Sequence, residues 1–408
     1  MVGDGVTQDY QEAVRWFRLA AEQGHLGAQC KLGAMYERGQ GVAQDYQEAV
    51  RWYRQAAEKG DVLAQLSLGC SYRDGLGIRQ DYQEAVQWFR LAAYQGHAPA
   101  QYRLGSMYEN GQGVHQDYHE AVRWFRLAAE QGLDLAQNNL GCMYQDGLGV
   151  RQDYHEAVRW FRLAAEQGYP EAQFHLGVFY FSGKGVAQDY KEAIKWFRLA
   201  AEQEDPDAQF HLGVIYYSGQ GVAQDFKEAL KWYRLAAEQG HSAAQSLLGE
   251  MYTSSKGVAQ DYKEGKKWFQ KSADQGYPEG QRNLGVFYFQ GWGVPQDYKE
   301  AAKWFNLAIL QGDSQSELYL KEVQKKLMET KPRVRKASLK IKKPIESKSL
   351  TSALDDLFIE LNKLIGLSKV KDEIDKLIKF VSVQKMRHSK GLKAVSYTHL
   401  TLPTILRV

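Results

Sequence analysis

A tryptophan recurs every 36 residues along most of this chain, and this period constrains the fold more than any other feature. The series comprises Trp16, Trp52, Trp88, Trp124, Trp160, Trp196, Trp232, Trp268 and Trp304. The aspartate of a Gln-Asp-Tyr or Gln-Asp-Phe motif keeps the same period from Asp9 to Asp297. A fixed period between about 20 and 50 residues is typical of solenoids and repeat arrays. We therefore do not expect the 408 residues to form two or three globular domains.

One repeat, residues 25–60, contains two helical patterns joined by a glycine-containing loop. The first pattern covers about residues 26–38. In the second, Asp45 is placed to cap the amino terminus and Glu48 to complete a capping box. Apolar residues follow at helical spacing, and Gly60 fits a left-handed carboxyl-terminal cap. A single hairpin cannot bury its apolar stripe alone, so we predict an all-α solenoid of stacked helical hairpins.

These repeats resemble the Sel-one-like repeat, a relative of the tetratricopeptide repeat. One copy carries the pattern of that family at Ala172, Leu176, Gly177, Tyr180, Gly183, Gly185, Val186, Asp189, Ala193, Trp196, Ala200 and Ala201. The resemblance covers about residues 1–324 in roughly nine copies, of which the first is incomplete. It implies a right-handed α-solenoid that binds other proteins on its concave face. Three departures are local: Glu204 and Ser255 stand where other copies have turn glycines, and Gly265 replaces a helical alanine.

Composition agrees with a chain that has no membrane span. The chain is 44% hydrophobic with a net charge of +3, and it has no apolar run of 18 residues or more. Its start lacks the regions of a signal peptide, although it begins inside a loop, so a truncated amino terminus remains open. Cys70 and Cys142 hold the same repeat position two units apart, about 20 Å, which is too far for a disulfide. We therefore expect a cytoplasmic location.

Differences between the copies are the best guide to function. On the outward side of the first helix, early repeats present charged and amide side chains, whereas repeats within residues 169–290 present aromatic ones. We predict a partner-binding site on the concave face, made of Phe174, His175, Phe181, Phe210, His211, Tyr217 and Phe289. The alternative is that the curvature of the superhelix buries these side chains against neighbouring helices.

Catalytic and metal sites are not indicated. The Gly-x-Gly loops lack the strand, helix and lysine that a phosphate-binding loop requires. His175 and His211 are one repeat apart, about 10 Å, which is too far for a shared metal ion. No nucleophile, paired acid or cofactor motif is present, so we predict that the chain is not an enzyme and needs no cofactor.

The carboxyl-terminal quarter leaves the repeat. Residues 325–350 form a basic segment that we interpret as a linker. Residues 351–395 resemble the lead-in of AAA-plus ATPases of the CbxX/CfxQ type, and the matching residues are Leu364, Ile365, Gly366, Leu367, Val370, Lys371 and Ile374. That resemblance implies that Ile365 and Gly366 lie beside an adenine, but no phosphate loop follows. An ordinary pair of amphipathic helices is the alternative, and we interpret residues 396–408 as a non-native tail.

The preferred function is a non-catalytic scaffold or adaptor that binds a peptide or helix of another protein. The alternative is a fragment of an ATP-driven AAA-plus remodelling enzyme whose repeats recruit clients. A secreted family member that binds cell-wall fragments is a third reading, and the lack of a cysteine pair in each repeat counts against it. We also expect that the first repeat can support self-association, that nucleic acid is not a partner, and that the source is bacterial.

Overall fold

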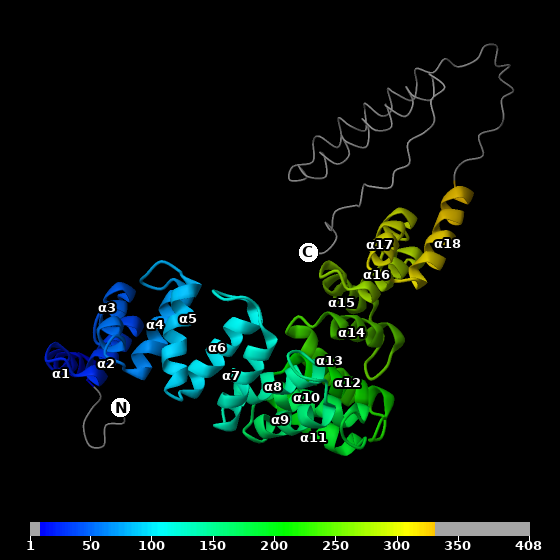
Figure 1. Cartoon of the computed structure of the whole chain (residues 1–408). Helices are drawn as coiled ribbons and strands as arrows, with labels where there is room; N and C mark the ends of the chain where they lie inside the picture. The colour runs from blue at the N-terminus through cyan, green and yellow to red at the C-terminus, as the bar shows by residue number, and fades with distance from the viewer. Residues whose placement is uncertain (1–8, 331–408) are drawn as a thin grey trace, which may run out of the picture. The chain divides into compact units, whose positions relative to one another are not determined.

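The computed structural model describes residues 9–330, and these residues form 18 α-helices with no strands (Figure 1). The first helices of the successive hairpins are α2 (Leu26–Arg38), α4 (Val62–Asp74), α6 (Ala98–Asn110), α8 (Asp134–Asp146), α10 (Pro170–Ser182), α12 (Pro206–Ser218), α14 (Ser242–Ser254) and α16 (Pro278–Gln290). The second helices are α1 (Tyr10–Glu22), α3 (Tyr46–Ala57), α5 (Tyr82–Tyr94), α7 (Tyr118–Glu130), α9 (Tyr154–Glu166), α11 (Tyr190–Glu202), α13 (Phe226–Glu238), α15 (Tyr262–Asp274) and α17 (Tyr298–Leu310). The prediction of an all-α array of helical hairpins is confirmed.

An aspartate caps the amino terminus of the second helix in each hairpin. The capping box predicted for Asp45 and Glu48 is only half formed. Asp45 Oδ1 accepts from the backbone N–H groups of Gln47 and Glu48 at 2.9 and 3.0 Å. The N–H of Asp45 donates to the carbonyl of Tyr36 in the first helix at 2.9 Å. The Glu48 side chain therefore does not reach back to the cap and accepts from Arg51 at 3.4 Å instead.

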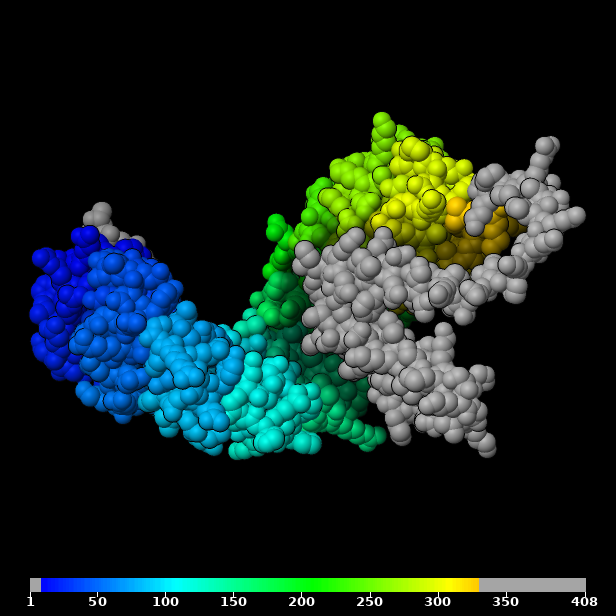
Figure 2. Space-filling view, turned by 90° about the horizontal axis from the view of Figure 1, so that it is seen from above, coloured from blue at the N-terminus to red at the C-terminus, as the bar shows by residue number. Residues whose placement is uncertain are grey.

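The core lies between hairpins, because each repeat tryptophan packs into the hairpin that precedes it. Trp124 of α7 lies in one cluster with Phe89 of α5 and Leu104 of α6. Trp16 of α1 is 64% exposed, since no hairpin precedes α1 among the described residues. Figure 2 shows these hairpins following one another along the array.

A second contact between hairpins uses the loop glycines. Gly149 has φ +68°, and a Cβ added there would lie 2.1 Å from the carbonyl oxygen of Tyr118 in the preceding hairpin. Only glycine permits the loop and the helix start to approach so closely. The same position in the neighbouring repeats is also glycine, so stacking and turn geometry are encoded together.

The two turn positions that lack glycine keep the left-handed backbone. Glu204 has φ +67° and Ser255 has φ +60°, and they are the only non-glycine residues with positive φ among residues 9–330. Gly265 is buried inside α15, with the side chain of Thr253 and the backbone of Gly249 close to where its Cβ would lie. All three departures therefore preserve the repeat.

The last helix, α18 (Gln315–Thr330), covers the final hairpin. Val323 is fully buried in one cluster with Ala301 and Phe305. This helix extends to Thr330, past residue 324, where the solenoid is predicted to end. The predictions for residues 331–350, 351–395 (with Ile365 and Gly366) and 396–408 lie outside the described residues.

Candidate functional site

Four of the predicted site residues lie together in one row that crosses two hairpin junctions. Phe174 and His175 belong to α10, and Phe210 and His211 to α12. Phe174 and His211 form a T-shaped contact with 5.2 Å between ring centroids, and Phe210 forms one with the same imidazole at 5.4 Å. Phe210 also stacks on His241, the residue that caps α14, at 4.6 Å. We call these five residues the aromatic–imidazole row.

The row is half-buried rather than fully exposed, because its inner side packs against the second helices. His175 stacks on Phe161 of α9 at 4.6 Å, and His211 stacks on Phe197 of α11 at 5.2 Å. Phe174 also approaches Phe197, at 5.9 Å. These side chains therefore join adjacent helices while part of each ring remains accessible.

Burial lowers the pKa of His175 and His211. For His175, nearby Glu171 opposes this shift without outweighing it. For His211, the carbonyl of Asp207 accepts from Nδ1 at 2.8 Å, which fixes the proton on that nitrogen and leaves Nε2 as an acceptor. Both imidazoles are consequently neutral at pH 7.

Cys142 of α8 lies beside the row, with its Sγ 3.9 Å from His175 Nε2. Burial raises the pKa of this thiol to about 12. It is therefore protonated at neutral pH, and a nucleophilic role has no support from its surroundings.

Phe181 lies at the carboxyl-terminal end of α10 and Tyr217 at that of α12, whereas the row lies nearer the amino-terminal ends of these helices. Phe181 meets Tyr190 edge-on at 5.4 Å, and Tyr217 meets Phe226 at 5.3 Å. The ammonium group of Lys256 lies 4.7 Å from the centre of the Tyr217 ring and donates to its hydroxyl. Both aromatic residues are half-buried, so they form a second apolar strip on the same helices.

The predicted exposure of Phe289 is wrong. Its side chain is only 7% exposed and lies in one cluster with Phe305 and Val323. The reason is α18, whose Val323 shares this core and covers the last hairpin. Phe289 is therefore buried against neighbouring helices, which was the alternative to a role in binding, and we exclude it from the candidate site.

Two polar residues beside the row, Asn138 and Glu171, are not among the residues predicted from the sequence. Asn138 of α8 is 3% exposed, and its Nδ2 donates to Glu171 Oε2 of α10 at 3.3 Å. Tyr169 also donates to this carboxylate, at 3.0 Å. The signal was present in the sequence, because Asn138 holds the repeat position that carries Phe174 and Phe210 in the next two hairpins.

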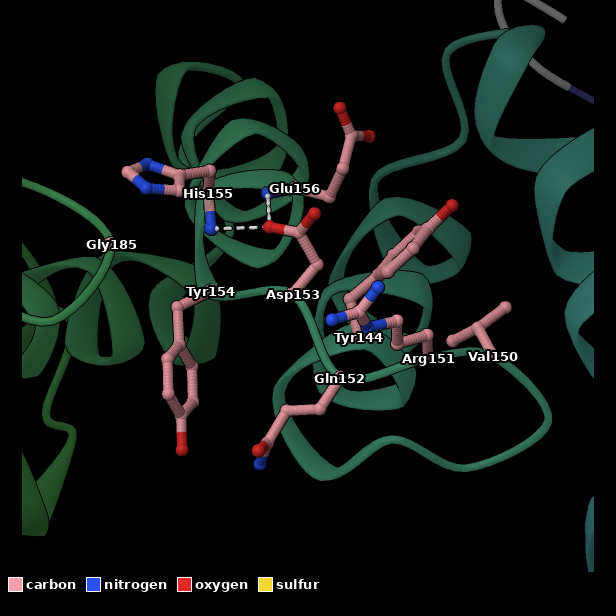
Figure 3. A pocket seen from close by; sticks show the side chains of 9 residues that line it. All are labelled: Tyr144, Val150, Arg151, Gln152, Asp153, Tyr154, His155, Glu156 and Gly185. Carbon is pink, nitrogen blue, oxygen red and sulfur yellow. Dashed lines mark hydrogen bonds between the residues drawn. The ribbon is translucent and has the colours of Figure 1, made fainter.

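A pocket of about 750 Å³ opens between two loops rather than on the aromatic–imidazole row (Figure 3). It is lined by Tyr144, Val150, Arg151, Gln152, Asp153, Tyr154, His155, Glu156 and Gly185. Asp153 Oδ1 accepts from the N–H groups of His155 and Glu156 at 2.9 and 3.1 Å, so this carboxylate serves as a helix cap. Among residues 9–330 no group of three histidine, cysteine or carboxylate side chains is arranged to hold a metal ion.

The geometry defines a helical-repeat protein. The half-buried residues of its aromatic–imidazole row lie along the helices α10 and α12 and at the start of α14, and not in an enclosed cleft. The Sel1 repeat matches nine consecutive segments, at residues 1–25, 27–61, 62–97, 98–133, 134–169, 170–205, 206–241, 242–277 and 278–313. The chain therefore belongs to the Sel1 repeat family.

Two solved structures support this assignment. A protective antigen of uropathogenic Escherichia coli with an SLR fold is 33% identical, with a TM-score of 0.63, and the match covers 97% of this chain and 92% of that chain. A Sel1 repeat protein from Oxalobacter formigenes is 34% identical, with a TM-score of 0.60, and the match covers 78% of this chain and 94% of that chain. A comparison with curated protein sequences gives no match. No helix among residues 9–330 is long and apolar enough to cross a membrane.

Proposed function

We propose that this chain is a non-catalytic scaffold whose first helices α8, α10, α12 and α14 hold a segment of another protein. Sel1 repeat proteins are typically protein-interaction scaffolds. The single observation that carries the location is the aromatic–imidazole row, which stays half-exposed across two hairpin junctions. We call the outward faces of these four helices the first-helix layer.

The spacing of the apolar strips suits an elongated partner. Equivalent residues on successive first helices are about 10 Å apart, because that is the usual distance between packed helices. A peptide or helix laid across the layer meets an aromatic group at each step. Large aromatic side chains at the centre of an interface commonly contribute most of the binding energy.

Peptide selection followed by mutation tests the proposal. A phage-displayed library of random peptides is selected against the full chain, and the dissociation constant of a selected synthetic peptide is measured. Changing Phe181→Ala together with Tyr217→Ala should weaken binding at least about 10-fold, as for interface aromatic residues generally. These two residues are chosen because they lie outside the row that joins the helices.

The second helices offer a matched control. Leu199 and Leu235 are exposed on α11 and α13, also one repeat apart. Changing Leu199→Ala together with Leu235→Ala should alter the dissociation constant by less than about twofold, because surface truncations away from a contact are nearly neutral. The proposal fails if no peptide is selected, or if the leucine pair weakens binding as much as the aromatic pair. Circular dichroism melts of both variants exclude loss of folding as the cause.

The relation of residues 351–395 to an AAA-plus lead-in stays a prediction, since those residues lie outside the described part of the chain. If a longer parent exists, the solenoid would recruit clients to its ATPase. Titration of the full chain with ATP tests this reading, and we expect no heat of binding. Self-association through the first repeat also stays a prediction, which the sedimentation mass in solution tests.

A further inference from the structure

The first-helix layer carries acidic residues and no basic ones. The helices α8, α10, α12 and α14 contain no lysine or arginine. Their charged residues are Asp134, Asp146, Glu171, Asp207 and Glu250. In the second helices α11, α13 and α15, by contrast, lysine and arginine outnumber aspartate and glutamate, and in α9 the two kinds are equal in number. The two sides of the same hairpins therefore differ in charge.

These carboxylates are available to a partner. Asp146, Glu171, Asp207 and Glu250 are exposed, and none of them forms an ion pair with lysine or arginine within residues 9–330. Asp207 does lie 3.2 Å from His241 Nε2. The first-turn glutamates of the second helices α9, α11, α13 and α15 differ, because each pairs with the arginine or lysine three residues later, as Glu156 does with Arg159 at 3.4 Å.

A buried amide gives a second, independent indication of a ligand with hydrogen-bond donors. Asn138 uses Nδ2 to donate to Glu171, and its Oδ1 has no donor within the described residues. An unpaired buried acceptor is costly, so a site that leaves one beside a carboxylate favours a donor-rich ligand. Lysine and arginine side chains carry several N–H donors and no acceptor.

We infer that the segment bound by the first-helix layer is a cationic, amphipathic peptide. Its lysine or arginine side chains face Glu171, Asp207 and Glu250, and its apolar side chains face the aromatic–imidazole row. Cations also interact favourably with aromatic faces, which the row supplies next to the carboxylates. Nucleic acid is disfavoured, because its phosphates would meet an acidic surface. This inference rests on the proposed function and specifies the chemistry of the partner.

The composition of selected peptides is the first test. In the phage selection against the full chain, we expect lysine and arginine to be enriched over the starting library, and aspartate and glutamate to be depleted. Selected peptides that are neutral or acidic overturn this inference but leave the proposed function standing. A selection that yields no peptide overturns the proposed function itself.

Charge removal is the second test. The triple change Glu171→Gln, Asp207→Asn and Glu250→Gln should raise the dissociation constant of a selected peptide about 10-fold at low ionic strength. Each exposed ion pair contributes modestly to binding, and three are lost together. High ionic strength should reduce this difference, because salt screens exposed charges. The matched control removes three exposed glutamates of the second helices, through Glu166→Gln, Glu202→Gln and Glu238→Gln. If the first-helix variant binds the peptide as tightly as this control, the inference of a cationic partner is wrong. The proposed scaffold function is then still tested by the Phe181→Ala, Tyr217→Ala variant.

Discussion

The side-chain amide of Gln95 donates to the side-chain oxygen of Gln65 at 2.8 Å. Gln65 in turn donates to the carbonyl of Ala57, so one buried glutamine joins two second helices. Later hairpins repeat this arrangement, for example between Gln167 and Gln137 at 2.8 Å. It makes these junctions depend on a polar contact inside the core as well as on apolar packing.

Replacing Lys59 by glutamine should stabilise the array. Lys59 stands where later repeats have the donor glutamine, and the oxygen Oε1 of Gln29 is buried without a partner. Supplying that donor should raise the free energy of unfolding by about 1 kcal/mol. Urea denaturation measures the change, and the exposed change Lys31→Gln serves as the control. A Lys59→Gln protein no more stable than this control would contradict the account. Gln281 Oε1 also lacks a donor although Gln311 is present, and nothing in the structure explains it.

Replacing Glu204 by glycine should also stabilise the chain. Its left-handed backbone, with φ +67°, costs about 1 kcal/mol for a residue with a side chain. The equivalent Gly168 has nothing within 4 Å of its would-be Cβ, so steric crowding does not contribute at this position. We expect Glu204→Gly to raise the free energy of unfolding by about 0.5 kcal/mol after the greater chain entropy of glycine is counted. Gly168→Ala should shift it in the opposite direction, and the same sign for both changes would contradict the explanation.

Gly149→Ala should be much more damaging than Gly168→Ala. Both positions have positive φ, but a Cβ at residue 149 would overlap the carbonyl oxygen of Tyr118. The difference between the free energies of unfolding of the two variants therefore measures the cost of steric overlap at the hairpin junction. We expect Gly149→Ala to lower the free energy of unfolding by about 3 kcal/mol in total. Equal losses in the two variants would show that the junction is not close-packed there.

Acidification should destabilise the fold through His175 and His211. Burial lowers the pKa of each imidazole below its usual 6.5, so the unfolded chain takes up protons that the folded chain does not. Their contribution to stability is present above pH 6.5 and is lost as the pH falls through the lowered values. Melting temperatures measured from pH 7.5 down to about pH 5 should fall less steeply in a His175→Asn, His211→Asn variant than in the wild type. Parallel profiles would contradict the assignment.

Sequence alone predicts the hairpins well, because their residues satisfy local rules. The aspartate caps, the turn glycines and the tryptophan period all act within one repeat or between adjacent repeats. The capping box at Glu48 was only half right, since the N–H of Asp45 is already bonded to Tyr36 of the first helix. That bond depends on how the two helices pack, which a local motif does not specify.

The candidate site was less predictable, because exposure depends on what covers a helix. Phe289 has the same repeat position as Phe181 and Tyr217, but α18 follows the last hairpin and buries it. The contact between Asn138 and Glu171 crosses two first helices and spans 33 residues. A comparison of single positions between repeats does not pair different positions across a junction.

Hydrogen–deuterium exchange of the full chain, with and without a selected peptide, tests the central claim most directly. We predict that bound peptide slows backbone exchange in α8, α10, α12 and α14, and leaves the second helices α9, α11 and α13 unchanged. Slower exchange confined to the second helices, or to the loops that line the pocket around Asp153, would contradict the proposal that the first-helix layer binds the partner.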